Sequence, residues 1–400
     1  MRKLILPFLL AVIFAGCQAR RSAPQEVVMS DERIIPADER TEMYLPLLRG
    51  KRVALFSNHT AVIGDRHVLD VLLENKVNVT AIFSPEHGFR GTADAGEHVS
   101  SSVDEQTGVP ILSLYDGKRR GPSDESMNQF DVLVVDIQDV GLRYYTYYVT
   151  MIRLMKACSL KDKPVIVLDR PNPNGHYVDG PILDMSLKSG VGGLPIPIVH
   201  GMTLGELALM ANDKGWIVEE KPGACELTVI PCENYTHHSF YMLPVAPSPN
   251  LPNMTAIYLY ASLCYFEGTD VSLGRGTDKP FQIYGHPDMK GYKFEFTPVS
   301  RFGAKNPPQQ NKLCHGVDLS DMSLEELRAK KIDLSYLIDA YHNLNVGDAF
   351  FTKFFELLVG RRDIRIMIEE GKTATEISAT WQDDVAQFKA DRKPYLLYEE

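Results

Sequence analysis

Between residues 51 and 169 the chain alternates short apolar, β-branched runs with segments of helical periodicity. The apolar runs predict five strands, at residues 52–56, 79–83, 111–114, 132–135 and 165–168. Apolar positions at three- and four-residue spacing predict helices at residues 67–76 and 147–157. Strands as apolar as these are covered on both faces, and helices between them require parallel pairing. The pattern therefore predicts an α/β fold with a Rossmann-like parallel sheet.

Beyond residue 169 the pattern loosens into loops rich in proline and glycine. A helix is predicted to begin near Thr203, because Thr203 and Glu206 have the spacing of a capping box. Four prolines within residues 244–252 exclude regular structure there, so we place a domain boundary near residue 250. Further helical patterns occur at residues 255–266, 323–330 and 375–388. We expect a Rossmann-like catalytic domain over residues 43–250 and a smaller α+β domain over 251–400 that completes the pocket.

The N-terminus has the features of an export signal. Two cations and a short apolar run precede Cys17, which directly follows an Ala-Gly pair, and this order resembles a bacterial lipoprotein signal. Residues 1–17 are therefore predicted to be the signal with its lipidated cysteine; the alternative is an ordinary cleaved signal in which Cys17 is incidental. Residues 18–42 are polar and predict a flexible tether. We expect an exported lipoprotein, anchored to a membrane in the periplasm or at the outer membrane.

Charge and cysteine content narrow the function classes. The formal net charge is −10, with both signs mixed along the chain, and no basic stripe indicates a nucleic-acid partner. The five cysteines after Cys17 lack the C-x-x-C spacing of a zinc or redox site. Cys225 and Cys232 could form a disulfide, or all five could be buried thiols. The first predicted strand is not followed by G-x-G-x-x-G, so we expect no dinucleotide cofactor, and no metal.

Polar residues follow all five predicted strands, where an open parallel sheet binds its ligands. Several have structural alternatives: Asp136 and Asp139 could be loop anions or partners of Arg143, while Asn172 and Asn174 could shape a turn. Carboxylates beside amides, guanidinia and tyrosines match the donors and acceptors of a sugar. Glycoside cleavage needs a protonated carboxylic acid at the leaving oxygen, and Glu86 is the candidate.

A series of long motifs is similar to one bacterial family, the exo-β-N-acetylmuramidases (NamZ-like), formerly a conserved domain of unknown function. The motifs lie at residues 84–88, 136–141, 169–175, 200–203, 247–252, 266–269, 274–277, 280–282 and 395–398. The resemblance runs from about Gly50 to the C-terminus. It implies a Rossmann-like domain and a smaller C-terminal domain with the pocket between them. It also implies release of N-acetylmuramic acid from the non-reducing ends of peptidoglycan fragments, which would be the partners of the protein. His176 and residues 57–60 depart from the usual family pattern.

The resemblance places the catalytic acid at Glu86 and leaves the second catalytic group open. A retaining enzyme needs another carboxylate about 5 Å away, and an inverting enzyme needs it about 6.5–9.5 Å away. Asp139 is the first candidate and Glu267 the second, while attack by the substrate's own 2-acetamido group needs neither. The expected substrate-binding residues are Asn58, His87, Arg90, Arg143, Tyr144, Tyr145, Asn172, Asn174, His200, Asn250, Glu267 and Arg275.

Selection of muramic acid over glucosamine requires recognition of the lactyl carboxylate, which a guanidinium can bind through two hydrogen bonds. Arg143 is the first candidate for this clamp, with Arg90 and Arg275 as the others. Two alternative functions remain at this stage. One is a metal-assisted hydrolase built on the His and acidic residues of 86–98, whose spacing fits no common zinc motif. The other is a glycan-binding lipoprotein without catalytic activity.

Overall fold

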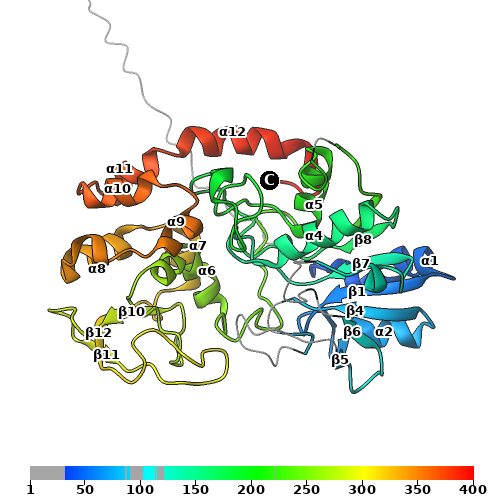
Figure 1. Ribbon diagram of the computed structural model, residues 1–400, viewed down its shortest axis with the longest axis horizontal. Helices are drawn as coiled ribbons and strands as arrows, with labels where there is room; N and C mark the ends of the chain where they lie inside the picture. Colours follow the sequence, from blue (N-terminus) through cyan, green and yellow to red (C-terminus); the bar gives the residue numbers. More distant parts are fainter. Residues whose placement is uncertain (1–31, 86–87, 91–101, 113, 115–120, 220) are drawn as a thin grey trace, which may run out of the picture.

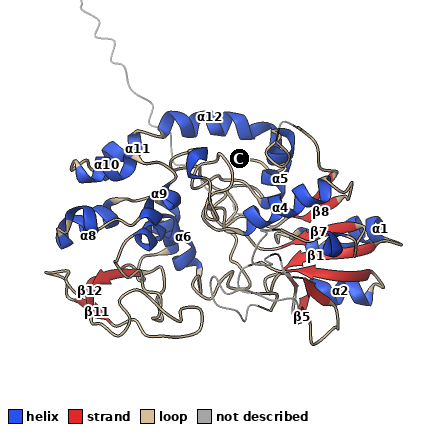
Figure 2. Cartoon of the chain, in the orientation of Figure 1, coloured by secondary structure: helices blue, strands red, loops and turns tan. Residues whose placement is uncertain are grey.

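The computed structural model describes residues 32–85, 88–90, 102–112, 114, 121–219 and 221–400. Cys17 and the predicted signal lie outside the described residues, as do Glu86 and His87. Within the described ranges, a seven-stranded sheet forms the first half of the chain and a three-stranded sheet with helices forms the second (Figure 1; Figure 2).

The large sheet has the architecture that the sequence predicts. Its strands lie in the order β5 (Ser102–Val103), β6 (Pro110–Leu112), β4 (Asn78–Phe83), β1 (Arg52–Ser57), β7 (Val132–Asp136), β8 (Val165–Leu168) and β9 (Leu227–Ile230). All neighbours pair in parallel except β5 with β6. Counted along the chain, the six parallel strands have the order 3-2-1-4-5-6 of Rossmann folds. The predicted fold class is therefore confirmed.

Alternating residues of the central strands enter two separate cores, because successive side chains of a strand point to opposite faces. Ala54 and Phe56 of β1 pack in the core with α4 (Tyr147–Ser159) and α5 (Leu204–Asp213). Val53 and Leu55 pack on the other face, where the covering helices are α1 (Thr41–Leu48) and α2 (Val68–Glu74). A short helix, α3 (Asp124–Met127), precedes β7. The predicted capping box of Thr203 and Glu206 is present at the start of α5.

The second half begins with α6 (Met254–Leu263) and the 3-10 turn Cys264–Gly268. Its sheet has the antiparallel order β10 (Ile283–His286), β12 (Cys314–Asp318) and β11 (Phe294–Phe296). The remaining helices are α7 (Leu324–Ala329), α8 (Ser335–Leu344), α9 (Lys353–Val359), α10 (Asp363–Glu369), α11 (Ala374–Ala379) and α12 (Gln382–Arg392). A two-stranded ribbon, β2 (Val62–Ile63) with β3 (Arg66–His67), follows β1.

The end of the chain returns to the first half. Helix α12 runs across the top of the molecule in Figure 1 and ends beside α5. Beyond it, the Leu397 amide donates to Glu206 of α5 at 2.8 Å, and the Tyr398 hydroxyl donates to Asp169 at 2.6 Å. The last residues therefore join the two halves of the molecule.

The predicted tether extends too far, because its last residues are folded. Ile35 pairs with Glu233 as an isolated bridge, and Asp38 is fully buried against Arg170. A buried carboxylate requires such a partner, and the partner lies 132 residues away, beyond the reach of a local pattern.

The five described cysteines are buried free thiols, so Cys225 and Cys232 form no disulfide. In the part of the chain that the structure describes, no helix combines the length and apolar character needed to cross a membrane.

Candidate active site

The carboxyl ends of β1 and β7 lie side by side where the strand order of the sheet reverses. Their last residues, Ser57 and Asp136, are register partners. On the other side of β1, β4 ends at Phe83, immediately before the loop that contains Glu86. Ligands of open parallel sheets bind beyond the carboxyl ends at such a reversal. The loops after these three strands therefore outline the candidate active site.

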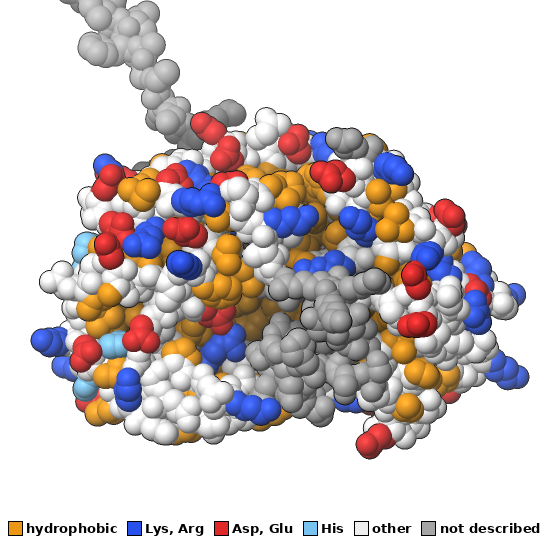
Figure 3. Space-filling model, viewed as in Figure 1, with side chains coloured by type: hydrophobic (Ala, Val, Ile, Leu, Met, Phe, Trp, Pro, Cys, Tyr) orange, Lys and Arg blue, Asp and Glu red, His pale blue; other side chains and the backbone are white. Residues whose placement is uncertain are grey.

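This edge of the sheet faces the second half of the chain. The hydroxyl of Tyr144, in the loop after β7, donates to the carbonyls of Tyr260 and Ala261 in α6 at 2.9 and 2.8 Å. Figure 3 shows a hollow with hydrophobic walls between the two halves on this face.

Asn58, directly after β1, is fully buried and fixed by three hydrogen bonds. Its Oδ1 accepts from the Thr60 amide at 3.0 Å and from the Thr60 hydroxyl at 2.6 Å, while its Nδ2 donates to the Tyr147 hydroxyl at 3.1 Å. The Thr60 hydroxyl oxygen accepts from the amide of Gln138 after β7 at 3.1 Å. Asn58 thus ties two rim loops together, and a direct contact of its side chain with substrate stays a prediction.

Asp139 keeps one unpaired carboxylate oxygen. Its Oδ1 accepts from the Gly141 amide at 2.8 Å, whereas buried Oδ2 has no hydrogen-bond partner in the described ranges. Burial raises the pKa of Asp139 to about 7, although nearby backbone N–H groups oppose the rise. This carboxyl group can therefore hold a proton at neutral pH.

Glu86 and His87 lie outside the described residues, but the residues that flank them are held on both sides. Ser84 and Pro85 are buried. The Gly88 amide donates to the Pro85 carbonyl at 3.2 Å, and Gly88 has a φ of +76°, which favours glycine. Pro85 and Gly88, the described residues on either side of Glu86 and His87, are therefore fixed relative to each other at the end of β4.

Arg90 secures the same loop from its far side. Its Nε and Nη2 donate to the two carboxylate oxygens of Asp104 at 2.9 and 2.8 Å. Burial acts to raise the pKa of Asp104, but hydrogen bonds from Arg90 and Thr107 outweigh it and hold the pKa below its usual range. Two of the guanidinium donors are thus committed to a structural pair, which weakens the prediction that Arg90 binds substrate.

Arg143, the first candidate for the lactyl clamp, is buried with no exposed surface. Its Nη1 donates to the carbonyls of Pro181 and Ile196 at 2.7 and 2.9 Å, and its Nη2 donates to those of Leu358 and Val359 at 3.1 and 2.6 Å. Burial lowers its pKa to about 10, so it remains charged at neutral pH. The alternative that Arg143 pairs with Asp136 or Asp139 is wrong, because its guanidinium fastens α9 to the first half. Its role as the lactyl clamp stays a prediction, which the complete burial of the side chain disfavours.

Tyr144 and Tyr145 pack within the protein, and their binding of a sugar stays a prediction that this packing disfavours. Both are buried, and the Tyr145 hydroxyl donates to the Pro247 carbonyl at 2.8 Å. Their rings contact the Tyr260 ring edge-on, with centroids 5.0 and 6.3 Å away. The pair packs the sheet domain against α6 and the proline-rich seam.

Asn172 and Asn174 shape a buried turn, which was the structural alternative. Asn172 donates to the Met202 carbonyl at 2.8 Å and accepts from the Asn174 amide at 2.8 Å, and Asn174 donates to the Val140 carbonyl at 2.8 Å. A Cβ at Gly141, where φ is +76°, would lie 2.2 Å from the Asn172 amide nitrogen. The motifs at residues 136–141 and 169–175 therefore pack directly against each other, and substrate binding by these asparagines stays a prediction.

His200 and Asn250 are also buried. The His200 Nδ1 accepts from the Met202 amide at 3.2 Å, and burial lowers the pKa of His200 to about 3, which keeps it neutral. Asn250 donates to the Gly303 carbonyl at 2.8 Å and so joins the seam to a loop of the second half. Both side chains thus have structural contacts, and their direct binding of substrate stays a prediction.

Glu267 and Arg275 form the most accessible charged pair among the predicted site residues. Arg275 donates through Nε and Nη2 to a single oxygen of Glu267, at 2.8 and 2.5 Å, and both side chains are 22% exposed. The guanidinium lies 5.0 Å from the centroid of the Phe281 ring. That ring contacts Tyr260, which in turn contacts Tyr145 of the rim. A chain of buried aromatic contacts therefore connects the pair to Tyr145 of the rim.

Sequence reasoning missed the roles of two buried networks. Arg170 donates to Asp136 at 2.6 Å and to Asp38 at 2.5 Å, and Asp169 accepts from the hydroxyls of Thr203 and Tyr398. Their partners lie up to 229 residues apart. The only sequence signal is the occurrence of each member in a long motif.

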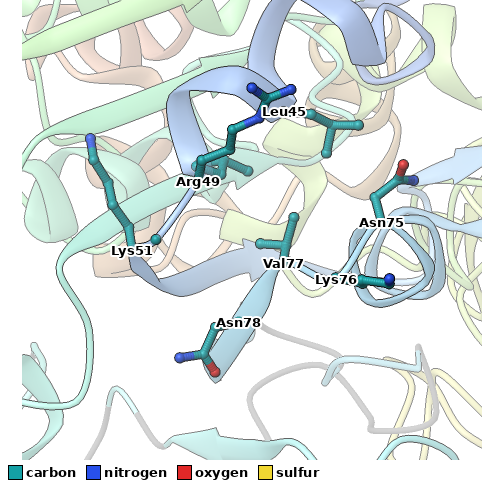
Figure 4. Close-up of a pocket in the computed structure, with 9 residues that line it drawn as sticks. Leu45, Arg49, Lys51, Asn75, Lys76, Val77 and Asn78 are labelled. Carbon is teal, nitrogen blue, oxygen red and sulfur yellow. The ribbon is translucent and has the colours of Figure 1, made fainter.

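A cavity of the sheet domain lies at the opposite edge. It has a volume of about 300 Å³ and is lined by the ends of α1 and α2 and the starts of β1 and β4 (Figure 4). Arg49, Lys51 and Lys76 give it a positive rim. It shares no residue with the strand ends that form the candidate site.

No group of three His, Cys, Asp or Glu side chains suited to a metal ion occurs in the described ranges. The residues of the metal-assisted alternative, 86–87 and 94–98, lie outside them.

Comparison with known proteins identifies relatives along the whole chain. The family described as exo-beta-N-acetylmuramidase NamZ matches through its N-terminal part at residues 53–255 and its C-terminal part at residues 258–398. A peptidoglycan beta-N-acetylmuramidase, NamZ, from Bacillus subtilis (strain 168) is 37% identical and aligns over 100% of both chains.

Two crystal structures of DUF1343 family proteins from Bacteroides fragilis NCTC 9343 have the same fold. One is 63% identical, with a TM-score of 0.85 over 92% of this chain and 100% of that protein. The other is 28% identical, with a TM-score of 0.77 over 92% of this chain and 99% of that protein.

Proposed function

Because the chain belongs to the NamZ family of exo-β-N-acetylmuramidases, and is a glycoside hydrolase, we propose that it removes N-acetylmuramic acid from the non-reducing ends of peptidoglycan fragments. One observation carries the proposal: the full-length, 37% identity to a peptidoglycan beta-N-acetylmuramidase, with no part of either chain unmatched. The substrate pocket is the hollow between the strand ends and the second half of the chain.

Glu86 is the proposed general acid. Cleavage requires a proton at the leaving glycosidic oxygen. Glu86 follows β4 in the chain, and the end of β4 lies next to β1 at the edge of the sheet where ligands of this fold bind. Ser84 and Pro85, directly before Glu86, are buried, and surroundings poor in water favour the protonated form of a carboxylic acid.

The two candidates for the second catalytic carboxylate, Asp139 and Glu267, exchange their order when their burial and charge are considered. A base or nucleophile must be ionised and accessible. Asp139 is buried and its pKa is raised to about 7, whereas Glu267 is partly exposed and ion-paired with Arg275. We therefore place Glu267 first and Asp139 second. The third route, attack by the 2-acetamido group, remains an alternative that needs neither as nucleophile.

Arg275 replaces Arg143 as the proposed clamp for the lactyl carboxylate. Arg143 has all its Nη donors directed at four backbone carbonyls, and Arg90 is held bidentately by Asp104. Arg275 uses two donors on one oxygen of Glu267, which leaves its Nη1 edge available to a second carboxylate. The same guanidinium would then orient Glu267 and select muramic acid.

Membrane attachment through Cys17 is part of the proposal, and it rests on the small residues and cysteine that end the apolar run of the signal. The peptidoglycan fragments would then be processed outside the cytoplasm.

Product analysis tests the proposed activity. We expect a disaccharide and a tetrasaccharide that begin with N-acetylmuramic acid to lose only that first sugar, detected by mass spectrometry. Internal fragments from the tetrasaccharide, or no free monosaccharide from either, would contradict the exo-acting assignment. The anomeric configuration of the first product, followed by NMR, separates retention from inversion.

A further inference from the structure

A loop of the second half, residues 298–313 between β11 and β12, carries three exposed apolar side chains. Phe302 is 60% exposed, Leu313 is 51% exposed and Val299 is 38% exposed. Single exposed apolar residues are common, but a group beside a concave site marks a binding surface.

The loop is fixed by its own backbone. The Asn311 amide donates to the Pro298 carbonyl at 2.7 Å, which closes the loop. Arg301 and Ala304 exchange both backbone hydrogen bonds, at 3.1 and 2.9 Å, so Phe302 occupies the tip of a two-residue hairpin. The backbone of Phe302 is therefore fixed by a tight turn with its side chain exposed to solvent, so it loses little conformational entropy when a ligand binds.

Contacts on both sides of this hairpin belong to the candidate active site. Asn250 of the seam donates to the Gly303 carbonyl, and a Cβ at Gly303 would lie 2.7 Å from the Pro249 side chain. On the other side, the Val299 amide donates at 3.0 Å to the carbonyl of Gly276, the neighbour of Arg275. The loop thus bridges the seam over the strand ends and the proposed lactyl clamp.

We propose that the Phe302 ring stacks on a sugar of the leaving group. This sugar would be the first ring after the cleaved glycosidic bond or one further along the glycan. This inference rests on the proposed exo-acting function. An exo-acting enzyme binds one terminal sugar inside its pocket. The rest of the bound glycan must therefore extend out of the hollow across its rim. The apolar face of a pyranose ring matches an exposed, preorganised aromatic ring, and aromatic side chains dominate such contacts.

The test compares substrates of different length in wild type and Phe302→Ala. We expect the KM of a muramyl-terminated tetrasaccharide to rise about tenfold in the variant, because the loss of one well-packed contact changes affinity by about that factor. The kcat/KM of an aryl muramide, which has no second sugar, should stay unchanged. Phe302→Trp should restore the tetrasaccharide KM, and Phe354→Ala, at a 37% exposed position on α9, is the matched control.

An unchanged tetrasaccharide KM in Phe302→Ala would overturn the proposed stacking, as would equal losses on both substrates. Loss of binding to anionic lipid vesicles with unchanged glycan kinetics would also overturn it, by assigning the loop to a membrane. If wild type cleaves neither substrate, the proposed function fails separately. Calorimetric binding of the intact tetrasaccharide to wild type and variant then still decides whether Phe302 contacts glycan.

Discussion

At the residue scale, motif arginines that look equivalent in the sequence have different roles. Arg275→Ala should lower kcat/KM on aryl muramides about 10- to 100-fold, because a charge-assisted hydrogen bond contributes about 1.5–3 kcal/mol. The aryl glucosaminide, which lacks the lactyl carboxylate, should be affected much less. Arg275→Lys keeps the positive charge but lacks the planar guanidinium that donates two parallel hydrogen bonds. It should therefore show only part of the wild-type selectivity for muramides over glucosaminides. Equal losses on the two substrates would reassign Arg275 to the positioning of Glu267 alone.

Asp139 gives a prediction about pH. Its pKa is about 7 in the fold against 3.8 for the free group, so the folded state binds the proton more tightly. The stability contributed by this proton is present below pH 4 and is lost as pH rises through 7, a loss of up to about 4 kcal/mol. Asp139→Asn keeps the acceptor for Gly141 and should therefore gain stability over wild type as pH rises from 5 to 8.

Thermal unfolding across this pH range checks the prediction. Asp131 is the control with the opposite sign, since hydrogen bonds from Arg52 lower its pKa to about 2. Asp131→Asn should lose stability relative to wild type at neutral pH. A difference between Asp139→Asn and wild type that does not vary with pH would show that Asp139 is not protonated in the fold.

The sequence predicted where the candidate site lies in the fold. It could not predict which of the side chains there are accessible to a substrate. Polar residues after consecutive strands identify the rim, because parallel strands bring their carboxyl ends together. Whether a side chain at the rim is free depends on partners that are distant in sequence. Arg143 is satisfied by carbonyls up to 216 residues away, and Asn250 by one 53 residues away. No local pattern contains that information.

At the element scale, strongly periodic segments were predicted well and marginal ones were not. The five predicted strands and the α5 capping box are present. The sixth parallel strand, β9, was missed because it is four residues long and lies at the sheet edge, with only Ile230 buried. The predicted helix at 375–388 is two helices, α11 and α12, because the chain breaks at Trp381, whose indole donates to Asp179 at 2.9 Å.

The C-terminal segment gives a prediction at the same scale. Tyr398→Phe removes the hydroxyl that donates to buried Asp169 and accepts from the Cys232 amide at 2.9 Å. Leaving buried groups unpaired costs about 1–3 kcal/mol, so the melting temperature should fall by several degrees. Tyr395→Phe, which breaks a hydrogen bond to the more exposed Asp213, is the control and should change it little. Equal effects of the two substitutions would mean that the segment does not fasten the halves together.

At the scale of the whole molecule, the proposed lipid anchor at Cys17 would decide where the enzyme works. If Cys17 carries lipid, Cys17→Ser should move the protein from the membrane fraction to the soluble fraction or leave it unprocessed. Immunoblotting of fractionated cells measures this directly, and Cys158→Ser, which alters a buried thiol of the folded body, is the control. The same distribution for wild type and Cys17→Ser would contradict the lipid anchor.

The central claim is that the carboxylic acid of Glu86, which follows β4 in the chain, protonates the glycosidic oxygen of the leaving sugar. The most direct measurement is the turnover of Glu86→Gln on a muramyl disaccharide and on an aryl muramide with a good leaving group. We expect kcat on the disaccharide to fall about 10²–10⁴-fold, and the aryl substrate to be partly spared because it needs less protonation. Glu42→Gln, on the exposed surface of α1, should match wild type on both substrates. Disaccharide turnover by Glu86→Gln at the wild-type rate would contradict the account and place the acid elsewhere.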